Sequence, residues 1–276
     1  MNYLRAIRLR EPPQRDRYLN DIPAVRQLIR EGSLAFPSPV TIFVGENGTG
    51  KSTILEAIAV AMGFNAEGGG REHRFSTQDS HSELWELLTP VQSVSPDDGF
   101  FLRAESFYNT SSYLERSGSR LARFGRRPLH ERSHGEAFLA LVQNRFEGRG
   151  LYLLDEPEAA LSPQRLLSLL VAMHDLIGKD SQFIIATHSP IVMAFPGAEI
   201  KLFDEEGIHT VSYRDTDHYQ ITKQFINDPE RMLSYLFQQL QWQRSLGVQH
   251  FFIRLLKSVR CCKQKTQPRS ACAERG

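Results

Sequence analysis

The sequence predicts an α/β fold in which a mostly parallel sheet is flanked by helices. Short apolar, β-branched runs of strand length alternate with stretches of helical periodicity along most of the chain. Strands of a parallel sheet read as continuous apolar runs because helices cover both faces. With 276 residues, of which 41% are hydrophobic and 24% charged, the chain is long enough for one such domain with a sizeable core.

The first half of the chain pairs strand-like runs with one clear helix. Residues 3–9 and 39–44 have the composition of strands, and a glycine ends the second run abruptly. Over residues 52–62 the apolar positions follow the i, i+3, i+4, i+7 spacing of a buried helical face. Residues 63–98 are polar and rich in turn-forming residues, so we expect loops there around one short helix near residues 84–88.

The second half continues this alternation, with apolar runs of buried-strand length on either side of an amphipathic stretch. A capping residue, a proline in the first turn and an adjacent acid predict that a helix opens at Pro229. The other elements predicted after residue 98 are strands at 100–103, 151–154 and 182–186, helices at 133–146 and 163–177, and a hairpin over 200–213.

Residues 45–52 match the phosphate-binding pattern G-x-x-x-x-G-K-[ST], between a predicted strand and a predicted helix. Glycines let backbone N–H groups curl around phosphate oxygens, and the helix N-terminus adds partial positive charge. Lys51 would reach the β- and γ-phosphates and Ser52 would ligate Mg²⁺, which predicts a P-loop protein that binds a nucleoside triphosphate with Mg²⁺. The residues assigned to this nucleotide site are Gly45, Asn47, Gly48, Thr49, Gly50, Lys51, Ser52 and Thr53.

Two adjacent acids follow the predicted strand at 151–154. In P-loop enzymes a carboxylate at the end of a neighbouring strand holds Mg²⁺, and Asp155 fits that role. Glu156 is then the predicted base for the attacking water. His188 follows another apolar strand, at the sheet edge where α/β ligand sites form, and is assigned to the γ-phosphate. With Lys51, these two residues form the predicted catalytic set; the alternatives are an acidic cap at a strand exit and a solvated histidine.

Four segments in this order resemble the ATP-binding-cassette class of P-loop ATPases: residues 45–52, 155–157, 160–162 and 187–189. Within that class the pattern is most similar to small standalone AAA-family ATP-binding proteins related to the SMC and RecF ATPases. The resemblance covers about residues 1–235. It implies that ATP drives two copies into a head-to-tail homodimer with two nucleotides sandwiched between them.

The resemblance also implies a serine–glycine signature at a helix start, which contacts the γ-phosphate bound to the other subunit. Residues 133–136, which begin 22 residues before Asp155, match it and assign Ser133 and Gly135 to the nucleotide. Ser133 and Glu136 also form an S-x-x-E capping box, so a well-capped helix without this contact is the alternative. The segment departs from the usual signature at Arg132, His134 and Glu136.

A rival motif overlaps this segment, since His130, Glu131 and His134 match the H-E-x-x-H pattern of zinc peptidases. That chemistry needs both histidines on one face of a continuous helix, a third ligand and the glutamate as base. Pro128 precedes the first histidine, and the capping box starts a helix inside the motif. The zinc peptidase is therefore a remote alternative.

Several roles are open to an ATPase of this kind. Only 104 residues separate Lys51 from Asp155, without a heptad run, which excludes a repair ATPase with long coiled-coil arms. The main prediction is an ATP-hydrolysing dimer that drives a protein partner, such as a nuclease, in DNA repair or defence. The alternatives are the ATPase subunit of a transporter and an ATP-gated dimerisation switch with negligible turnover. Glu105 stands where the class has the glutamine of its glutamine loop. Because it is not a glutamine, the residue equivalent to that glutamine is left unassigned.

The net charge of +1 divides unevenly along the chain. Residues 243–276 carry a net +7 and all three cysteines, whereas residues 1–242 carry −6. The acidic body gives no sign of a broad DNA-binding surface, because such surfaces are basic. DNA binding is therefore an open alternative that the charge of the body does not support. We expect an ATPase domain over 1–242, with a helical signature subdomain at about 105–145, and then a flexible basic tail. Three interpretations of the tail are open: an unstructured extension, the product of a shifted reading frame, or an arm that binds polyanions.

The sequence contains no run of 18 apolar residues, and its start lacks the long apolar segment of a secretory signal. We therefore expect no membrane span and a cytoplasmic location. The body lacks cysteine, which excludes a disulfide framework and a thiolate metal site there.

Overall fold

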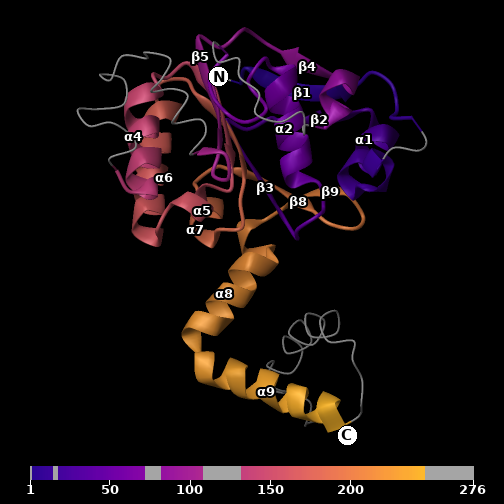
Figure 1. The fold of residues 1–276 in the computed structure, drawn as a ribbon, viewed down its shortest axis with the longest axis vertical. Coiled ribbons are helices and arrows are strands. Elements are labelled where there is room, and N and C mark those ends of the chain that lie inside the picture. The colour runs from indigo at the N-terminus through magenta and orange to yellow at the C-terminus, as the bar shows by residue number, and fades with distance from the viewer. Residues whose placement is uncertain (1, 15–17, 72–81, 108–131, 246–276) are drawn as a thin grey trace, which may run out of the picture. The chain divides into compact units, whose positions relative to one another are not determined.

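The computed structural model describes residues 2–14, 18–71, 82–107 and 132–245. Contacts divide the chain into two compact units, Met1–Thr216 and Asp217–Gly276. The first unit holds two sheets and the helices that cover them (Figure 1). Within the described ranges, none of the helices has the length and apolar character that a membrane crossing requires.

A six-stranded sheet in the order β5-β6-β7-β3-β8-β9 forms the centre of the first unit. Neighbouring strands are parallel except β8 and β9, which form the predicted hairpin as an antiparallel edge. The mostly parallel α/β sheet is thus confirmed, and its three central strands β6, β7 and β3 are buried along their whole length. The strands are β3 (Val40–Gly45), β5 (Asp98–Arg103), β6 (Gly150–Asp155), β7 (Gln182–Ala186), β8 (Glu199–Phe203) and β9 (Ile208–Val211).

Helices cover both faces of this sheet (Figure 1). The predicted helix at 163–177 begins as its sequence indicates, with Pro163 in the first turn and the Ser162 hydroxyl accepting the Arg165 N–H at 3.4 Å. The helices of the first unit are α1 (Pro23–Glu31), α2 (Lys51–Ala61), α4 (His134–Arg145), α5 (Pro157–Ala160), α6 (Pro163–Ile177) and α7 (Pro190–Met193), with 3₁₀ turns at Tyr18–Asp21, Glu83–Leu87 and Tyr213–Asp215.

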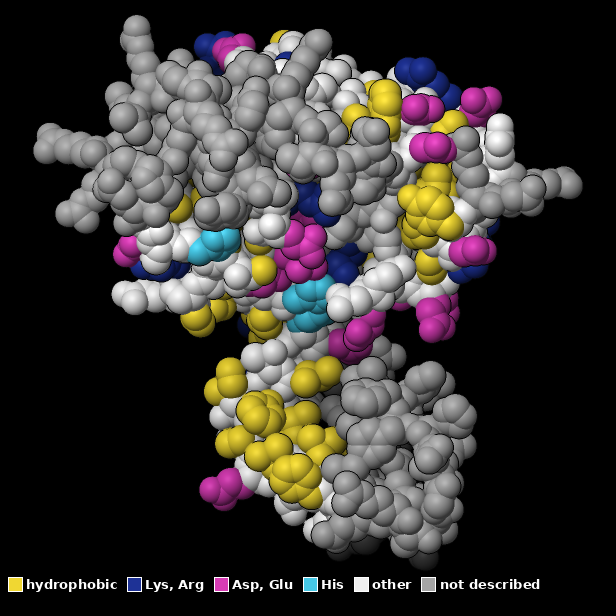
Figure 2. All heavy atoms as spheres, in the orientation of Figure 1, with side chains coloured by type: hydrophobic (Ala, Val, Ile, Leu, Met, Phe, Trp, Pro, Cys, Tyr) yellow, Lys and Arg dark blue, Asp and Glu magenta, His cyan; other side chains and the backbone are white. Residues whose placement is uncertain are grey.

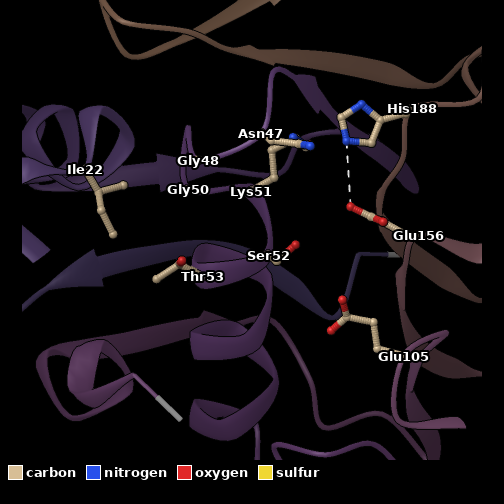
Figure 3. Close-up of a pocket in the computed structure, with 10 residues that line it drawn as sticks. All are labelled: Ile22, Asn47, Gly48, Gly50, Lys51, Ser52, Thr53, Glu105, Glu156 and His188. Atoms are coloured by element: carbon tan, nitrogen blue, oxygen red, sulfur yellow. Dashed lines mark ion pairs between the residues drawn. The ribbon is translucent and has the colours of Figure 1, made fainter. Parts of the chain in front are cut away.

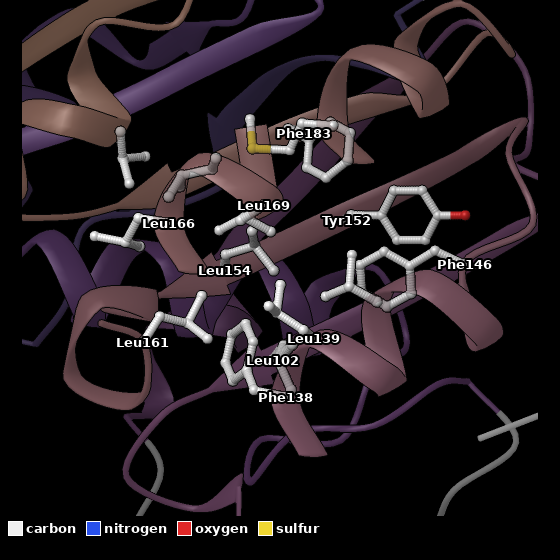
Figure 4. Close-up of a cluster of buried hydrophobic side chains, with 14 of the residues drawn as sticks. Leu102, Phe138, Leu139, Phe146, Tyr152, Leu154, Leu161, Leu166, Leu169 and Phe183 are labelled. Atoms are coloured by element: carbon white, nitrogen blue, oxygen red, sulfur yellow. The ribbon is translucent and has the colours of Figure 1, made fainter. Parts of the chain in front are cut away.

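The sheet separates two hydrophobic cores. Successive side chains of a strand point to opposite faces, so Tyr152 and Leu154 of β6 belong to one core and Leu151 and Leu153 to the other. Figure 4 shows the first core, in which side chains of β6 pack with those of α4 and α6, including Phe138. The second core lies between the sheet, α1, α2 and the smaller sheet.

A second, antiparallel sheet in the order β2-β1-β4 was not predicted. Its strands are β1 (Leu4–Leu9), β2 (Ser33–Ala35) and β4 (Leu88–Gln92). The expectation of loops throughout residues 63–98 was wrong at β4, which contains Pro90 and lies in a polar region. The predicted short helix is present as the 3₁₀ turn Glu83–Leu87. β2 has only three residues, too few for a period-two pattern to be visible.

The second unit contains α8 (Asp217–Asn227) and α9 (Pro229–Ser245). As predicted, a helix opens at Pro229, and Asp228 Oδ1 accepts the Arg231 N–H at 3.0 Å. Figure 2 shows apolar side chains gathered on these helices, and Phe225, Ile226 and Phe237 are exposed. The division after Thr216 differs from the boundary expected after residue 242, which stays a prediction because residues 246–276 lie outside the described ranges.

Candidate nucleotide site

The predicted phosphate loop connects the end of β3 to the start of α2. Its glycines adopt backbone conformations that other residues rarely adopt. Gly45 has a φ of +142°, and an added Cβ would overlap the carbonyl oxygen of Phe203 on β8. Gly50 has a φ of +101°, and a Cβ there would lie 2.5 Å from the side chain of Ile22. Within the loop the Thr49 hydroxyl donates to the Glu46 carbonyl at 2.9 Å. The loop is therefore held tightly against the sheet and α1.

Lys51 lies at the first position of α2 and is only 4% exposed. Its Nζ donates to the carbonyl oxygens of Gly45 and Glu46, each at 2.8 Å. Burial lowers the pKa of Lys51, against the opposing effect of Glu156 and other nearby carboxylates. The ammonium group is therefore hydrogen-bonded to its own loop. The oxygens of a bound phosphate chain would provide it with further hydrogen-bond acceptors there.

The two predicted Mg²⁺ ligands, Ser52 and Asp155, lie close together because the end of β6 lies beside the start of α2. Ser52 Oγ donates to Asp155 Oδ1 at 3.0 Å. A hydroxyl and a carboxylate at this distance are hard oxygen donors of the kind that Mg²⁺ prefers when phosphate oxygens and water complete its shell. Burial raises the pKa of Asp155 to about 6, while Arg103 and the Ser52 hydrogen bond oppose that rise. These residues fit a magnesium ion.

Arg103 was not predicted as part of the site. It ends β5, directly opposite Asp155 in the parallel pairing of β5 with β6. Its Nε lies 3.4 Å from Asp155 Oδ2, and its Nη1 donates to Glu56 of α2 at 2.5 Å. Arg103 therefore ties the carboxylate at the end of β6 to the helix that follows the phosphate loop, and it balances part of the buried negative charge.

Glu156 and His188 both line the cavity, and their side chains face each other (Figure 3). Glu156 has a φ of +49° and a ψ of 55°, a left-handed conformation that is uncommon outside glycine and is often found at functional sites. Its carboxylate lies 3.7 Å from His188 Nε2, and its N–H donates to the Ala186 carbonyl at 2.9 Å. Burial and the nearby Lys51 lower the pKa of His188, so the imidazole is neutral at pH 7.

These side chains surround one cavity of about 640 Å³. Of the predicted nucleotide residues, Gly45 and Thr49 support the loop without lining the cavity, and Asp155 borders a smaller, adjoining cavity of about 170 Å³. Ile22, at the start of α1, lines the cavity and was not predicted. The lining residues are Ile22, Asn47, Gly48, Gly50, Lys51, Ser52, Thr53, Glu105, Glu156 and His188.

Ser133 and Gly135 lie at the start of α4 and do not line this cavity. The predicted capping box is present: Glu136 accepts the Ser133 N–H at 3.1 Å. Arg165 of α6 contacts both ends of the box, with Nη1 3.3 Å from Ser133 Oγ and Nη2 3.0 Å from Glu136 Oε1. A Cβ on Gly135 would lie 2.8 Å from the Ala160 carbonyl, so a glycine permits the close approach of α4 and α5.

The rival zinc motif is only partly described, because His130 and Glu131 lie outside the described residues. His134 is the first residue of α4, and its ring packs edge-on against Phe107 at 5.1 Å between centroids. In the part of the chain that the structure describes, no group of three His, Cys, Asp or Glu side chains is placed to hold a metal ion.

Comparisons with known proteins agree with this geometry. Residues 22–110 match a family model described as "AAA domain", and residues 136–194 match one described as "AAA domain, putative AbiEii toxin, Type IV TA system". The cytochrome c biogenesis ATP-binding export protein CcmA of Paracoccus denitrificans is 27% identical over 157 residues, covering 56% of this chain and 71% of that protein. These matches support an ATP-binding-cassette-type P-loop ATPase.

One further protein matched by sequence and two solved structures are similar to this chain. An uncharacterized ABC transporter ATP-binding protein of Haemophilus influenzae is 23% identical over 192 residues, covering 60% of this chain and 70% of that protein. Among solved structures, cbiO1 of Clostridium perfringens, part of the ABC transporter complex cbiONQ, aligns with a TM-score of 0.45 at 15% identity, covering 86% and 100% of the two chains. The SMC head domain of Thermotoga maritima aligns with a TM-score of 0.40 at 16% identity, covering 76% and 98%.

Proposed function

We propose that this protein binds ATP with Mg²⁺ and hydrolyses it. The observation that carries the proposal is the single cavity in which Lys51, Glu156 and His188 meet, with Asp155 beside Ser52 at its border. The two curated relatives are named as ATP-binding proteins, which supports the same nucleotide.

Each side chain has a distinct task in this proposal. Lys51 and the loop N–H groups hold the β- and γ-phosphates, while Ser52 and Asp155 hold Mg²⁺, which when bound neutralises phosphate charge. Glu156 takes a proton from the water whose oxygen bonds to the γ-phosphorus as the bond to ADP breaks. The neutral His188 donates a hydrogen bond to a γ-phosphate oxygen.

The site is proposed to be completed by a second copy of the chain. Ser133 and Gly135 stand at a helix start whose N–H groups and partial positive charge suit an anion, yet they lie outside the cavity of their own subunit. A head-to-tail homodimer would bring them to the γ-phosphate held by the other Lys51.

Trapping the pre-hydrolysis state tests this dimer. Glu156→Gln removes the proposed base and keeps the shape of the side chain, so ATP should accumulate and the mass measured by light scattering should double when ATP is added. The matched control is the double variant that also carries Lys51→Ala, which should stay a monomer with ATP. A stable Glu156→Gln monomer under both conditions would refute the sandwich dimer.

Steady-state release of phosphate separates an enzyme from an ATP-gated switch. The wild-type protein should turn over, and Glu156→Gln should turn over about 10²- to 10⁴-fold more slowly, the usual contribution of a general base. Dimerisation with ATP and no release above background would favour the switch.

A transporter subunit is the second candidate, because the relatives are an export protein and an ABC transporter ATP-binding protein. That role requires a docking partner within the membrane, whereas our first choice is a protein partner such as a nuclease in repair or defence. Fractionating the native cell distinguishes them: a transporter subunit should sediment with membranes after a high-salt wash, and the first proposal expects the protein in the supernatant.

A further inference from the structure

Glu158 is a second glutamate beside the site, two residues after Glu156. It lies in α5, is partly buried and does not line the nucleotide cavity. Both of its carboxylate oxygens accept hydrogen bonds from the segment that leaves β7: Oε2 from the Thr187 hydroxyl at 2.7 Å, and Oε1 from the backbone N–H of His188 at 2.5 Å. Its acceptors are therefore directed at the loop that carries His188.

The rest of that loop is fixed by other hydrogen bonds. The Thr187 N–H donates to the Phe43 carbonyl of β3 at 3.1 Å, and the Thr187 Oγ1 accepts the Ser189 N–H at 3.0 Å. Between these two anchors, the peptide N–H of His188 is held by the Glu158 carboxylate. The direction in which the imidazole leaves the backbone therefore depends on this contact.

We propose that Glu158 is a positioning residue, which holds the backbone of His188 so that its imidazole faces Glu156 inside the cavity. Its effect on turnover rests on the proposed hydrolytic function, while its effect on the conformation of His188 does not. The two glutamates then divide the work: Glu156 lines the cavity and acts on water, and Glu158 acts through His188.

Three substitutions distinguish this role from that of a base. In Glu158→Gln the amide oxygen can still accept the His188 N–H, and the amide nitrogen can donate to the Thr187 hydroxyl, so the geometry is retained. Glu158→Ala loses both contacts. Glu156→Gln is the comparison for loss of the base, and Glu205→Ala, in the exposed turn between β8 and β9, is the control for a remote glutamate.

The expected turnover follows from these contacts. Glu158→Gln should stay within about threefold of the wild type, whereas Glu158→Ala should fall about 10- to 100-fold, the size expected for a lost hydrogen bond to a charged group. The dissociation constant for ATP should change by less than about twofold, because the phosphate loop is untouched. Glu205→Ala should match the wild type in both measurements. If Glu158→Gln were as inactive as Glu156→Gln, Glu158 would be a base and the proposal would be overturned.

The amide resonance of His188 provides a readout that needs no turnover. In protein labelled with ¹⁵N-histidine and assigned with His188→Gln, the amide proton should resonate far downfield, because it is bound to a carboxylate. It should move upfield in Glu158→Ala and much less in Glu158→Gln. An unchanged shift in Glu158→Ala would overturn the proposal. A changed shift together with a wild type that releases no phosphate would overturn the proposed function and leave the positioning role standing.

Should Glu158→Ala fail to fold, Glu158→Asp replaces it, since a carboxylate one methylene shorter cannot reach both donors. The same two measurements and the same outcomes then apply.

Discussion

At the scale of single residues, the nucleotide site depends on glycines, and these differ in what a side chain at their position would cost. Gly45 and Gly48 illustrate the difference, since both have positive φ and only one is crowded. The added Cβ at Gly45 meets the backbone of β8, whereas at Gly48 it meets nothing within 4 Å. A side chain at Gly48 would therefore meet only the conformational cost of a positive φ. A side chain at Gly45 would meet that cost and would also overlap the backbone of β8.

Gly45→Ala should therefore destabilise the fold more than Gly48→Ala does. We expect about 1–2 kcal/mol for Gly48→Ala, from the left-handed backbone, and clearly more for Gly45→Ala, because β3 and β8 must separate. Urea unfolding of both variants measures the difference. Equal losses of unfolding free energy would contradict the close approach of Phe203 to the loop.

Lys51 should contribute mainly to nucleotide affinity. Lys51→Ala removes a charged donor from a buried position, so the ATP dissociation constant should rise about 10- to 100-fold, as measured with a fluorescent nucleotide. Lys223→Ala, on α8 in the second unit, is the matched control and should bind ATP like the wild type. An unchanged dissociation constant in Lys51→Ala would place the phosphates elsewhere.

At the scale of elements, a buried polar cluster joins β5, β6 and α4. It lies where β5 begins, at the end of the strands away from the nucleotide cavity. Asp98 Oδ1 accepts Arg145 Nη1 at 2.7 Å, and Oδ2 accepts the Tyr152 hydroxyl at 2.7 Å and the Glu147 N–H at 3.1 Å. Burial alone would raise the pKa of Asp98, but these partners outweigh it and hold the pKa below its ordinary value of 3.8. The cluster fixes α4, and with it Ser133, to the sheet.

The pH dependence of stability should reveal this cluster. Because the pKa of Asp98 is lower in the folded protein, its stabilisation is complete above about pH 4 and is lost as the pH falls further. Asp98→Asn should cost about 3 kcal/mol of unfolding free energy at pH 7, and the gap to the wild type should shrink in more acid solution.

The neighbouring Asp97 supplies the control, since it forms an ion pair with Arg149 in which both side chains are more than half exposed. Asp97→Asn should change the unfolding free energy by less than about 1 kcal/mol at any pH. If the two variants unfold alike across the pH range, the cluster does not stabilise the sheet edge.

At the scale of the whole molecule, every residue that lines the nucleotide cavity lies between Ile22 and His188, within the unit Met1–Thr216. The residues of α8 are not buried. The first unit therefore contains a complete cavity and two hydrophobic cores of its own.

Shortened chains test that independence. Chains ending at Ser245 and at Thr216 should both fold and bind ATP within about twofold of the full chain, because neither loses a lining residue or a core side chain. If only the longer chain folds, the domain boundary lies after α9, near residue 242 as the charge distribution suggests.

The sequence alone determined the local features of this protein. The strand–loop–helix around Lys51, the acids that end β6 and the capping box at Ser133 depend on contacts within a few residues, so spacing and residue type are enough to locate them. The mostly parallel sheet followed in the same way from its buried apolar strands.

The tertiary structure decided which of these segments meet. The strand order places Arg103 opposite Asp155, and the exits of β6 and β7 bring Glu158 to the backbone of His188. Strand order depends on long-range pairing and leaves no local signal, so neither contact was predictable. The small sheet escaped prediction for a related reason: β2 and β4 are strands because β1 pairs with them, while their own residues are too few or too polar to predict strands.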